Sequence, residues 1–144
     1  MKAILDASVI VAAIATKNPQ SASRIVLEAV ARGACDLIIT NDIEDEYLEV
    51  ITKPKVIKAA PPGLNCRAFI SAIVKIAERI EPDRDVHVID DDPDDDRYVA
   101  AALAGHVDVV VTFDRKHLLA LKTHKEIRFL TPGDFLALLT QMMD

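Results

Sequence analysis

The chain contains no tryptophan, two tyrosines, four phenylalanines, four glycines and two cysteines in 144 residues. Cys35 and Cys66 form no CxxC pair and have no histidine pair at zinc-ligand spacing, so a zinc site is not predicted and two reduced thiols are expected. No glycine spacing matches a common phosphate-binding loop. Because aromatic residues are few, platforms for stacking nucleic-acid bases would also be few.

Long apolar runs are also missing, so no membrane span is predicted. The first acid, Asp6, comes too early for a signal peptide, and we expect a cytoplasmic protein. The length and the 51% hydrophobic content predict one domain over residues 1–144. Seventeen basic and 23 acidic residues give a net charge of −6, which argues against broad, non-specific adhesion to nucleic acid. A nucleic-acid enzyme is still compatible, because bound divalent ions reverse the local field.

Apolar runs alternate with segments of helical periodicity along the whole chain. The predicted strands are residues 2–5, 37–40, 86–89, 107–112 and 127–130. The predicted helices are residues 8–16, 20–32, 41–52, 66–80, 94–104, 116–121 and 134–142, with an irregular stretch at 53–63 that holds one short helical turn. Expected end signals are a left-handed stop at Gly33, a capping box of Asn41 and Glu44, and an N-cap at Asn65. The apolar strands and the alternation predict an α/β fold with a mostly parallel sheet and helices on both faces.

In such sheets, functional groups gather at the carboxyl ends of the strands. Asp6 follows the first predicted strand, and Asp114 follows the fourth. Either acid alone is explained as a helix N-cap or a loop residue. Asp95 and Asp96 belong to an acidic run over residues 90–96 that a solvated surface mostly explains. On the helix that follows, each of these two shares an arc with apolar residues, so periodicity does not choose between them.

The predicted helix over residues 41–52 offers four acids, and Glu46 borders its apolar side beside Ile43 and Val50. Periodicity prefers Glu46 to Asp45 and Glu49 only slightly. Carboxylates that converge on one cleft repel one another, and without lysine or arginine among them a divalent cation is the natural compensation. Ligation by oxygen alone suits Mg²⁺ or Mn²⁺, and such a site often serves phosphoryl chemistry.

Six segments together resemble the PIN-domain nucleases, particularly the group of toxin components of toxin–antitoxin systems. They are LDASV at 5–9, DEYLEV at 45–50, KPK at 53–55, DPDDDRY at 92–98, VTFD at 111–114 and LTPGDF at 130–135. The resemblance implies a three-layer α/β/α sandwich and Mg²⁺- or Mn²⁺-dependent cleavage of single-stranded RNA. It also implies a homodimer and an antitoxin protein as a partner.

Carried over by position, the acidic quartet that the resemblance implies for catalysis and metal binding is Asp6, Glu46, Asp95 and Asp114. A shift of one residue from Asp95 to Asp96 stays open. Supporting roles fall to Ser8, Asp92 and Thr112, and phosphate contacts to Lys53, Lys55 and Lys116, for which a solvated surface is an equal explanation. Phe113 stands where the family commonly has glycine.

Two other functions fit parts of the pattern. A haloacid-dehalogenase-like phosphatase also has an aspartate after its first strand, but its second aspartate would stand where this chain has Ser8. A catalytically inactive PIN-like binding module would need no acids, whereas this chain keeps an acid at all four positions.

Overall fold

A sheet of short strands forms the centre of the molecule. The computed structural model describes residues 1–82 and 93–143, except the side chains of residues 93–95 and 143. Within these ranges six strands form one sheet in the order β3-β2-β1-β4-β6-β5. Their bounds are β1 (Lys2–Leu5), β2 (Asp36–Ile39), β3 (Glu78–Arg79), β4 (Val109–Val111), β5 (Thr123–His124) and β6 (Ile127–Leu130). The pair β5–β6 is antiparallel and the other neighbouring pairs are parallel, which confirms the predicted mostly parallel sheet. The strand predicted at 86–89 lies outside the described residues.

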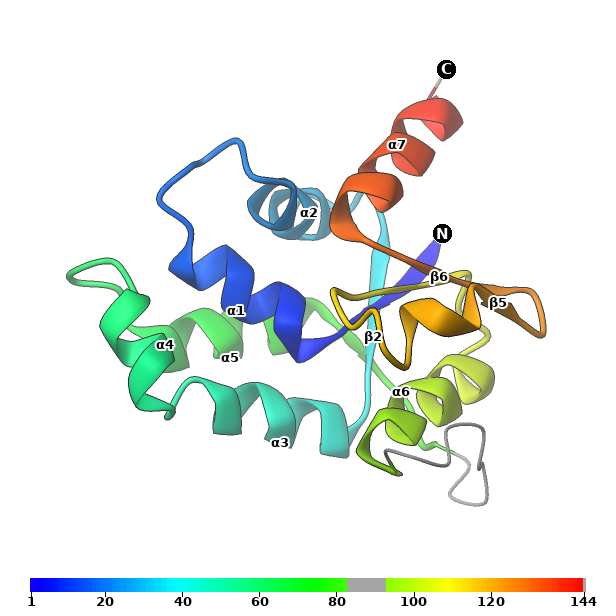
Figure 1. Cartoon of the computed structure of the whole chain (residues 1–144), viewed down its shortest axis with the longest axis horizontal. Coiled ribbons are helices and arrows are strands. Elements are labelled where there is room, and N and C mark those ends of the chain that lie inside the picture. The colour runs from blue at the N-terminus through cyan, green and yellow to red at the C-terminus, as the bar shows by residue number, and fades with distance from the viewer. Residues whose placement is uncertain (83–92, 144) are drawn as a thin grey trace.

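Helices cover both faces of this sheet. They are α1 (Ala7–Ala15), α2 (Ala22–Ala31), α3 (Asn41–Val50), α4 (Pro54–Ala59), α5 (Cys66–Ile76), α6 (Pro93–Ala104), α7 (Pro132–Met143) and the 3₁₀ turn η1 (Leu119–Leu121). In Figure 1, α7 lies above the β4–β6 region and α6 below it, and both helices pack against β4. The result is the predicted three-layer α/β/α arrangement. In the described part of the chain, no helix has the length and apolar character needed to cross a membrane.

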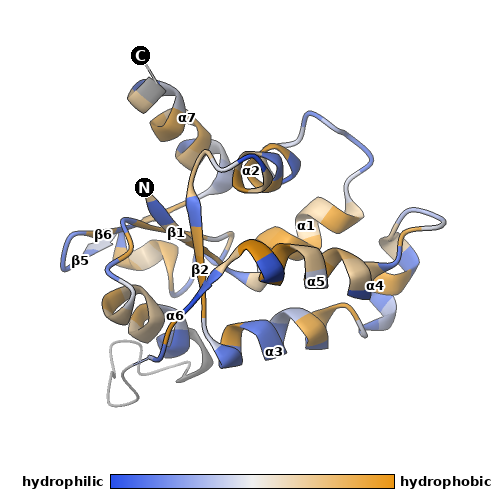
Figure 2. Ribbon diagram, turned by 180° about the vertical axis from the view of Figure 1, so that it is seen from behind, coloured by the Kyte–Doolittle hydropathy of each residue, from blue (hydrophilic) through white to orange (hydrophobic). Residues whose placement is uncertain are grey.

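The core explains why the strand runs are apolar without alternation. Ile4, Leu5 and Val110 are fully buried in strands that have helices on either side, so both faces of each strand must be apolar. Burial of one such side chain contributes about 1.5–3 kcal/mol. Figure 2 shows that α3 is largely hydrophilic with apolar bands along it, and its buried side chains are Ile43 and Tyr47. The elements behind the candidate site are therefore held by a continuous apolar core.

The helix ends confirm two of the predicted signals and correct one. Gly33 has a φ of 79°, as expected of a left-handed stop, and the Asn65 side chain accepts a hydrogen bond from the backbone of Ala68 at 3.0 Å. The capping box of Asn41 and Glu44 is wrong. Thr40 caps α3 through a 3.2 Å bond from the Ile43 N–H, and Glu44 instead pairs with Arg79 of β3.

Two short strands were not predicted. The strand β3 replaces the last turn of the helix expected to reach residue 80, and β5 forms a hairpin with β6. The hairpin turn uses Lys125 and Glu126 at φ values of 48° and 72°, positions where glycine or asparagine is usual. The helix predicted over 116–121 is reduced to η1, and the irregular stretch at 53–63 contains the six-residue α4.

Candidate active site

The carboxyl ends of β1 and β4 lie side by side because Leu5 pairs with Val111 in parallel register. The next residues along the two strands, Asp6 and Thr112, therefore meet. The Thr112 hydroxyl donates to Oδ2 of Asp6 at 2.6 Å, and the Asp6 N–H donates to the Val111 carbonyl at 2.9 Å. The sheet itself thus fixes the position of the Asp6 carboxylate.

A second hydroxyl repeats the same contact from the other side. Ser8 donates to the same oxygen of Asp6 at 2.9 Å. Each hydroxyl also accepts a backbone N–H: Ser8 from Phe113 at 3.1 Å, and Thr112 from Asp114 at 3.0 Å. The two hydroxyls therefore clamp the loop after β4 to the carboxylate at the end of β1.

The N-cap explanation for Asp6 does not hold. The residue occupies the N-cap position of α1, but its side chain makes no capping hydrogen bond. It is 7% exposed, and the two groups in residues 1–82 and 93–143 that donate hydrogen bonds to its side chain are neutral hydroxyls that share Oδ2. Among the described residues, no Lys, Arg or His forms an ion pair with it. An ionised carboxylate at such low exposure is energetically unfavourable unless a cation compensates it.

Tyr98 of α6 takes over the capping role and links two candidate acids. Its hydroxyl accepts the N–H of Ala7, the first residue of α1, at 3.2 Å and donates to Oε1 of Glu46 at 2.7 Å. Burial, then the nearby Asp6 and Tyr47, raises the pKa of Tyr98 well above its usual value, so its proton stays on the hydroxyl. Burial raises the pKa of Tyr47 likewise, and this hydroxyl donates to the Leu5 carbonyl.

Glu46 has a cationic neighbour, contrary to the expectation that no arginine lies among the acids. The Arg97 guanidinium donates to Oε2 of Glu46 at 3.2 Å, and the two side chains are 28% and 22% exposed. The charge of Glu46 is thus already partly compensated by the protein, whereas no cationic side chain in the part of the chain that the structure describes compensates that of Asp6.

The Asp114 side chain acts largely as a capping group in its loop, as the explanation of a helix N-cap or loop residue predicted. Its carboxylate accepts backbone N–H groups of Lys116 and His117 at 3.2 Å and of Leu118 at 3.4 Å, which satisfies the turn before η1. The His117 Nδ1 lies 3.7 Å from Oδ2 of Asp114. The Asp114 carboxylate is connected to Asp6 through the backbone and Thr112.

Of the two candidates for the third acid, the structure describes the side chain of Asp96 and not that of Asp95. Asp96 is 8% exposed in the first turns of α6, next to the Arg97–Tyr98 pair. The side chain of Asp95 and the whole of Asp92 lie outside the described residues, so both stay predictions. No three His, Cys, Asp or Glu side chains in the described ranges converge closely enough to hold a metal ion by themselves.

The three candidate lysines are exposed. Lys116 lies in the turn that Asp114 caps. Lys53 and Lys55 lie at the start of α4, which packs against α1.

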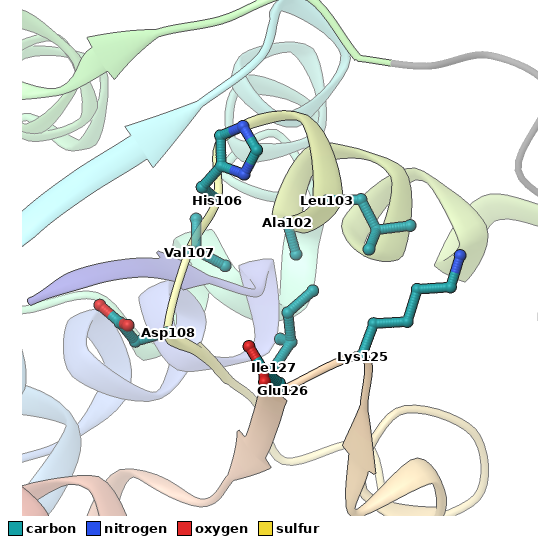
Figure 3. A pocket seen from close by; sticks show the side chains of 8 residues that line it. All are labelled: Ala102, Leu103, His106, Val107, Asp108, Lys125, Glu126 and Ile127. Carbon is teal, nitrogen blue, oxygen red and sulfur yellow. The ribbon is translucent and has the colours of Figure 1, made fainter.

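A shallow pocket of about 190 Å³ lies elsewhere (Figure 3), at the amino ends of β4 and β6. Residues of α6, of the loop before β4 and of the β5–β6 hairpin line this pocket, and they include His106, Asp108 and Lys125. Because the candidate acids follow the carboxyl ends of the strands, this pocket belongs to the opposite edge of the sheet.

Sequence reasoning did not identify two contributors, Arg97 and Tyr98. The sequence places Tyr98 only at the end of the segment DPDDDRY at 92–98. A tyrosine on a buried helix face does carry a signal, because its hydroxyl must find a hydrogen-bond partner. Nothing in the pattern identified Glu46, 52 residues away, as that partner.

Comparisons with known proteins agree with this fold. A sequence model described as "PIN domain" matches residues 2–116. The crystal structure of PAE2754 from Pyrobaculum aerophilum superposes with a TM-score of 0.57 at 17% identity, over 98% of this chain and 90% of that one. Comparison with curated proteins gave no match.

Proposed function

The chain belongs to the PIN-domain family, whose members are generally divalent-metal-dependent nucleases, and on that premise we propose that it is a Mg²⁺- or Mn²⁺-dependent endoribonuclease. Single-stranded RNA is the proposed substrate. A toxin role, a cytoplasmic location, an antitoxin partner and a homodimer belong to the same proposal and rest on the sequence resemblance.

One observation carries the proposal: the burial and the neutral surroundings of the Asp6 carboxylate. It is nearly buried and oriented by two neutral hydroxyls, and among the described residues it has no cationic partner. The hydrogen bonds that the described residues donate to its side chain end on Oδ2, which leaves Oδ1 as the oxygen proposed to bind a ligand. A hard divalent cation is the ligand that this donor chemistry fits, because Mg²⁺ and Mn²⁺ prefer oxygen and offset the charge.

The proposed ligands are Asp6, Asp95 and Asp114, with Asp96 as the alternative to Asp95. When bound, the metal would lower the pKa of a water molecule and offset charge on the phosphate. Glu46 completes the site or helps to orient and deprotonate that water. Tyr98 at 2.7 Å and Arg97 at 3.2 Å, which are among its partners, hold its carboxylate in one orientation, which is the positioning that such chemistry requires.

The decisive variant is Asp6→Asn. Its amide oxygen can still accept from Ser8 and Thr112, so the clamp survives while the charge is lost. We expect Mn²⁺-dependent cleavage of single-stranded RNA to disappear, together with the stabilisation that saturating Mn²⁺ gives the wild type. Stability without metal should be unchanged or higher, since an uncompensated buried charge is removed. Asp45→Asn, an exposed acid one residue from Glu46, is the matched control and should keep both properties.

Three outcomes would contradict this proposal. Undiminished RNA cleavage by Asp6→Asn would remove Asp6 from the mechanism. Hydrolysis of generic phosphate monoesters without RNA cleavage would favour the phosphatase. Absence of Mn²⁺ binding to the wild type would favour an inactive binding module.

A further inference from the structure

The loop that Ser8 and Thr112 clamp presents an aromatic ring to solvent. Phe113 is 44% exposed, and it is the one aromatic residue among the large apolar side chains that the described part of the chain exposes. Single exposed apolar residues are common on protein surfaces, so exposure alone assigns no role. The position of Phe113 makes it different from the others.

Phe113 is covalently placed between two parts of the candidate site. Thr112 before it donates to Asp6, and Asp114 after it is a candidate ligand. Because consecutive Cα atoms are about 3.8 Å apart, the ring starts within one residue of both. The Phe113 N–H donates a hydrogen bond to the Ser8 hydroxyl at 3.1 Å, so the backbone that carries the ring is fixed. The remaining large exposed apolar residues, Ile57, Leu64, Ile76 and Met142, are distant in sequence from these acids.

We propose that Phe113 is a stacking platform for a nucleobase of the single-stranded RNA whose phosphate is bound at the acids. This inference rests on the proposed function. A net charge of −6 makes phosphate attraction weak, whereas stacking on a base does not depend on charge. A rigidly held ring loses little conformational freedom on binding, which favours this role. Since every base has a π face, the platform accepts any sequence.

The experiment compares steady-state cleavage by the wild type, Phe113→Ala, Phe113→Trp and the control Ile57→Ala. Loss of one stacked base lowers affinity about 5- to 150-fold, so KM should rise by that factor in Phe113→Ala with kcat nearly unchanged. Phe113→Trp should keep the wild-type KM, and so should Ile57→Ala, which truncates a still more exposed apolar side chain on α4. Mn²⁺ affinity, measured by calorimetry, should be equal in all four proteins because no acid is altered.

Two further measurements separate stacking from other causes. A substrate with an abasic nucleotide at the stacked position should abolish the KM difference between wild type and Phe113→Ala. The difference should also be the same at about 50 and 200 mM salt, whereas a phosphate contact through Lys116 would weaken as salt rises.

Failure of this inference is distinguishable from failure of the proposed function. If the wild type does not cleave RNA with Mn²⁺, both are overturned. If the wild type cleaves and Phe113→Ala keeps its KM, the stacking role alone is overturned. A change of oligomeric mass in Phe113→Ala at unchanged KM would also overturn it, and would assign the ring to a protein contact.

Discussion

Replacing Thr112 with valine should destabilise the metal-free protein by about 2–4 kcal/mol. The hydroxyl is fully buried and makes two hydrogen bonds, one to the Asp6 carboxylate at 2.6 Å and one from the Asp114 N–H at 3.0 Å. A hydrogen bond to a charged group is worth about 1.5–3 kcal/mol, and leaving a buried N–H without an acceptor costs about 1–3 kcal/mol. The extra methyl group of valine returns part of this loss.

Ser8→Ala is the matched comparison because Ser8 makes the same two kinds of hydrogen bond. Ser8 is only half-buried, so water can replace its hydroxyl, and alanine is the better helix former within α1. The expected loss is therefore about 0.5–1.5 kcal/mol. Thr112→Ser is the second control. It keeps the hydroxyl and removes one buried methyl group, for a loss of about 1 kcal/mol.

The assay is urea unfolding followed by far-UV circular dichroism in the presence of a chelator, since the chain has no tryptophan to report by fluorescence. We expect the loss of unfolding free energy to be largest in Thr112→Val, followed by Thr112→Ser and then Ser8→Ala, with a near tie possible between the last two. If Thr112→Val and Thr112→Ser lose the same free energy, the hydroxyl contacts contribute nothing and the account of the clamp is wrong.

Two other features give stability predictions. Tyr98→Phe removes the 2.7 Å bond to Glu46 and should lose about 1.5–3 kcal/mol in urea unfolding; a loss below about 0.5 kcal/mol would mean that the bond is not formed. The pKa values of Tyr47 and Tyr98 are raised in the folded state, so these tyrosines ionise first in the unfolded chain. The free energy of unfolding should therefore be constant below about pH 10 and fall above it, by up to about 1.4 kcal/mol per pH unit for each tyrosine. The fall should be shallower in Tyr98→Phe. Gly105→Ala should lose about 1–3 kcal/mol, because a Cβ there would lie 2.9 and 3.0 Å from two isoleucine side chains. Gly133→Ala, with no atom nearer than 4.0 Å, should be neutral or gain up to about 1 kcal/mol, and the opposite order would refute both.

Local chemistry made the main elements predictable. Apolar runs long enough to be buried on both faces identified β1, β2, β4 and β6, and the end signals at Gly33 and Asn65 are contacts within one turn. The strands β3 and β5 have two residues each, which is too short for any periodicity. The capping error at α3 has a similar cause, because Thr40 and Asn41 are both good N-caps and only the backbone geometry chooses between them.

The candidate site was predictable only as far as topology extends. Parallel strands in register bring residues that follow their carboxyl ends together, so Asp6 and the loop of Asp114 could be placed near each other from the strand assignments alone. The contacts of Glu46 depend on how α3 packs against α6, and helical periodicity gives the buried arc without naming its partner. That is why Arg97 was not expected beside an acid.

The distribution of charge between Asp6 and Glu46 determines what a cation would gain in this site. Glu46 already has a guanidinium at 3.2 Å and a tyrosine hydroxyl at 2.7 Å, so a metal that replaced the guanidinium would gain little from it. Within the described residues the Asp6 side chain has neutral donors only, and its low exposure weakens screening by water. The binding free energy of a divalent ion should therefore depend more on Asp6 than on Glu46, which fits Glu46 better as a group that orients water than as a primary ligand. A larger loss of Mn²⁺ affinity in Glu46→Gln than in Asp6→Asn would reverse that assignment.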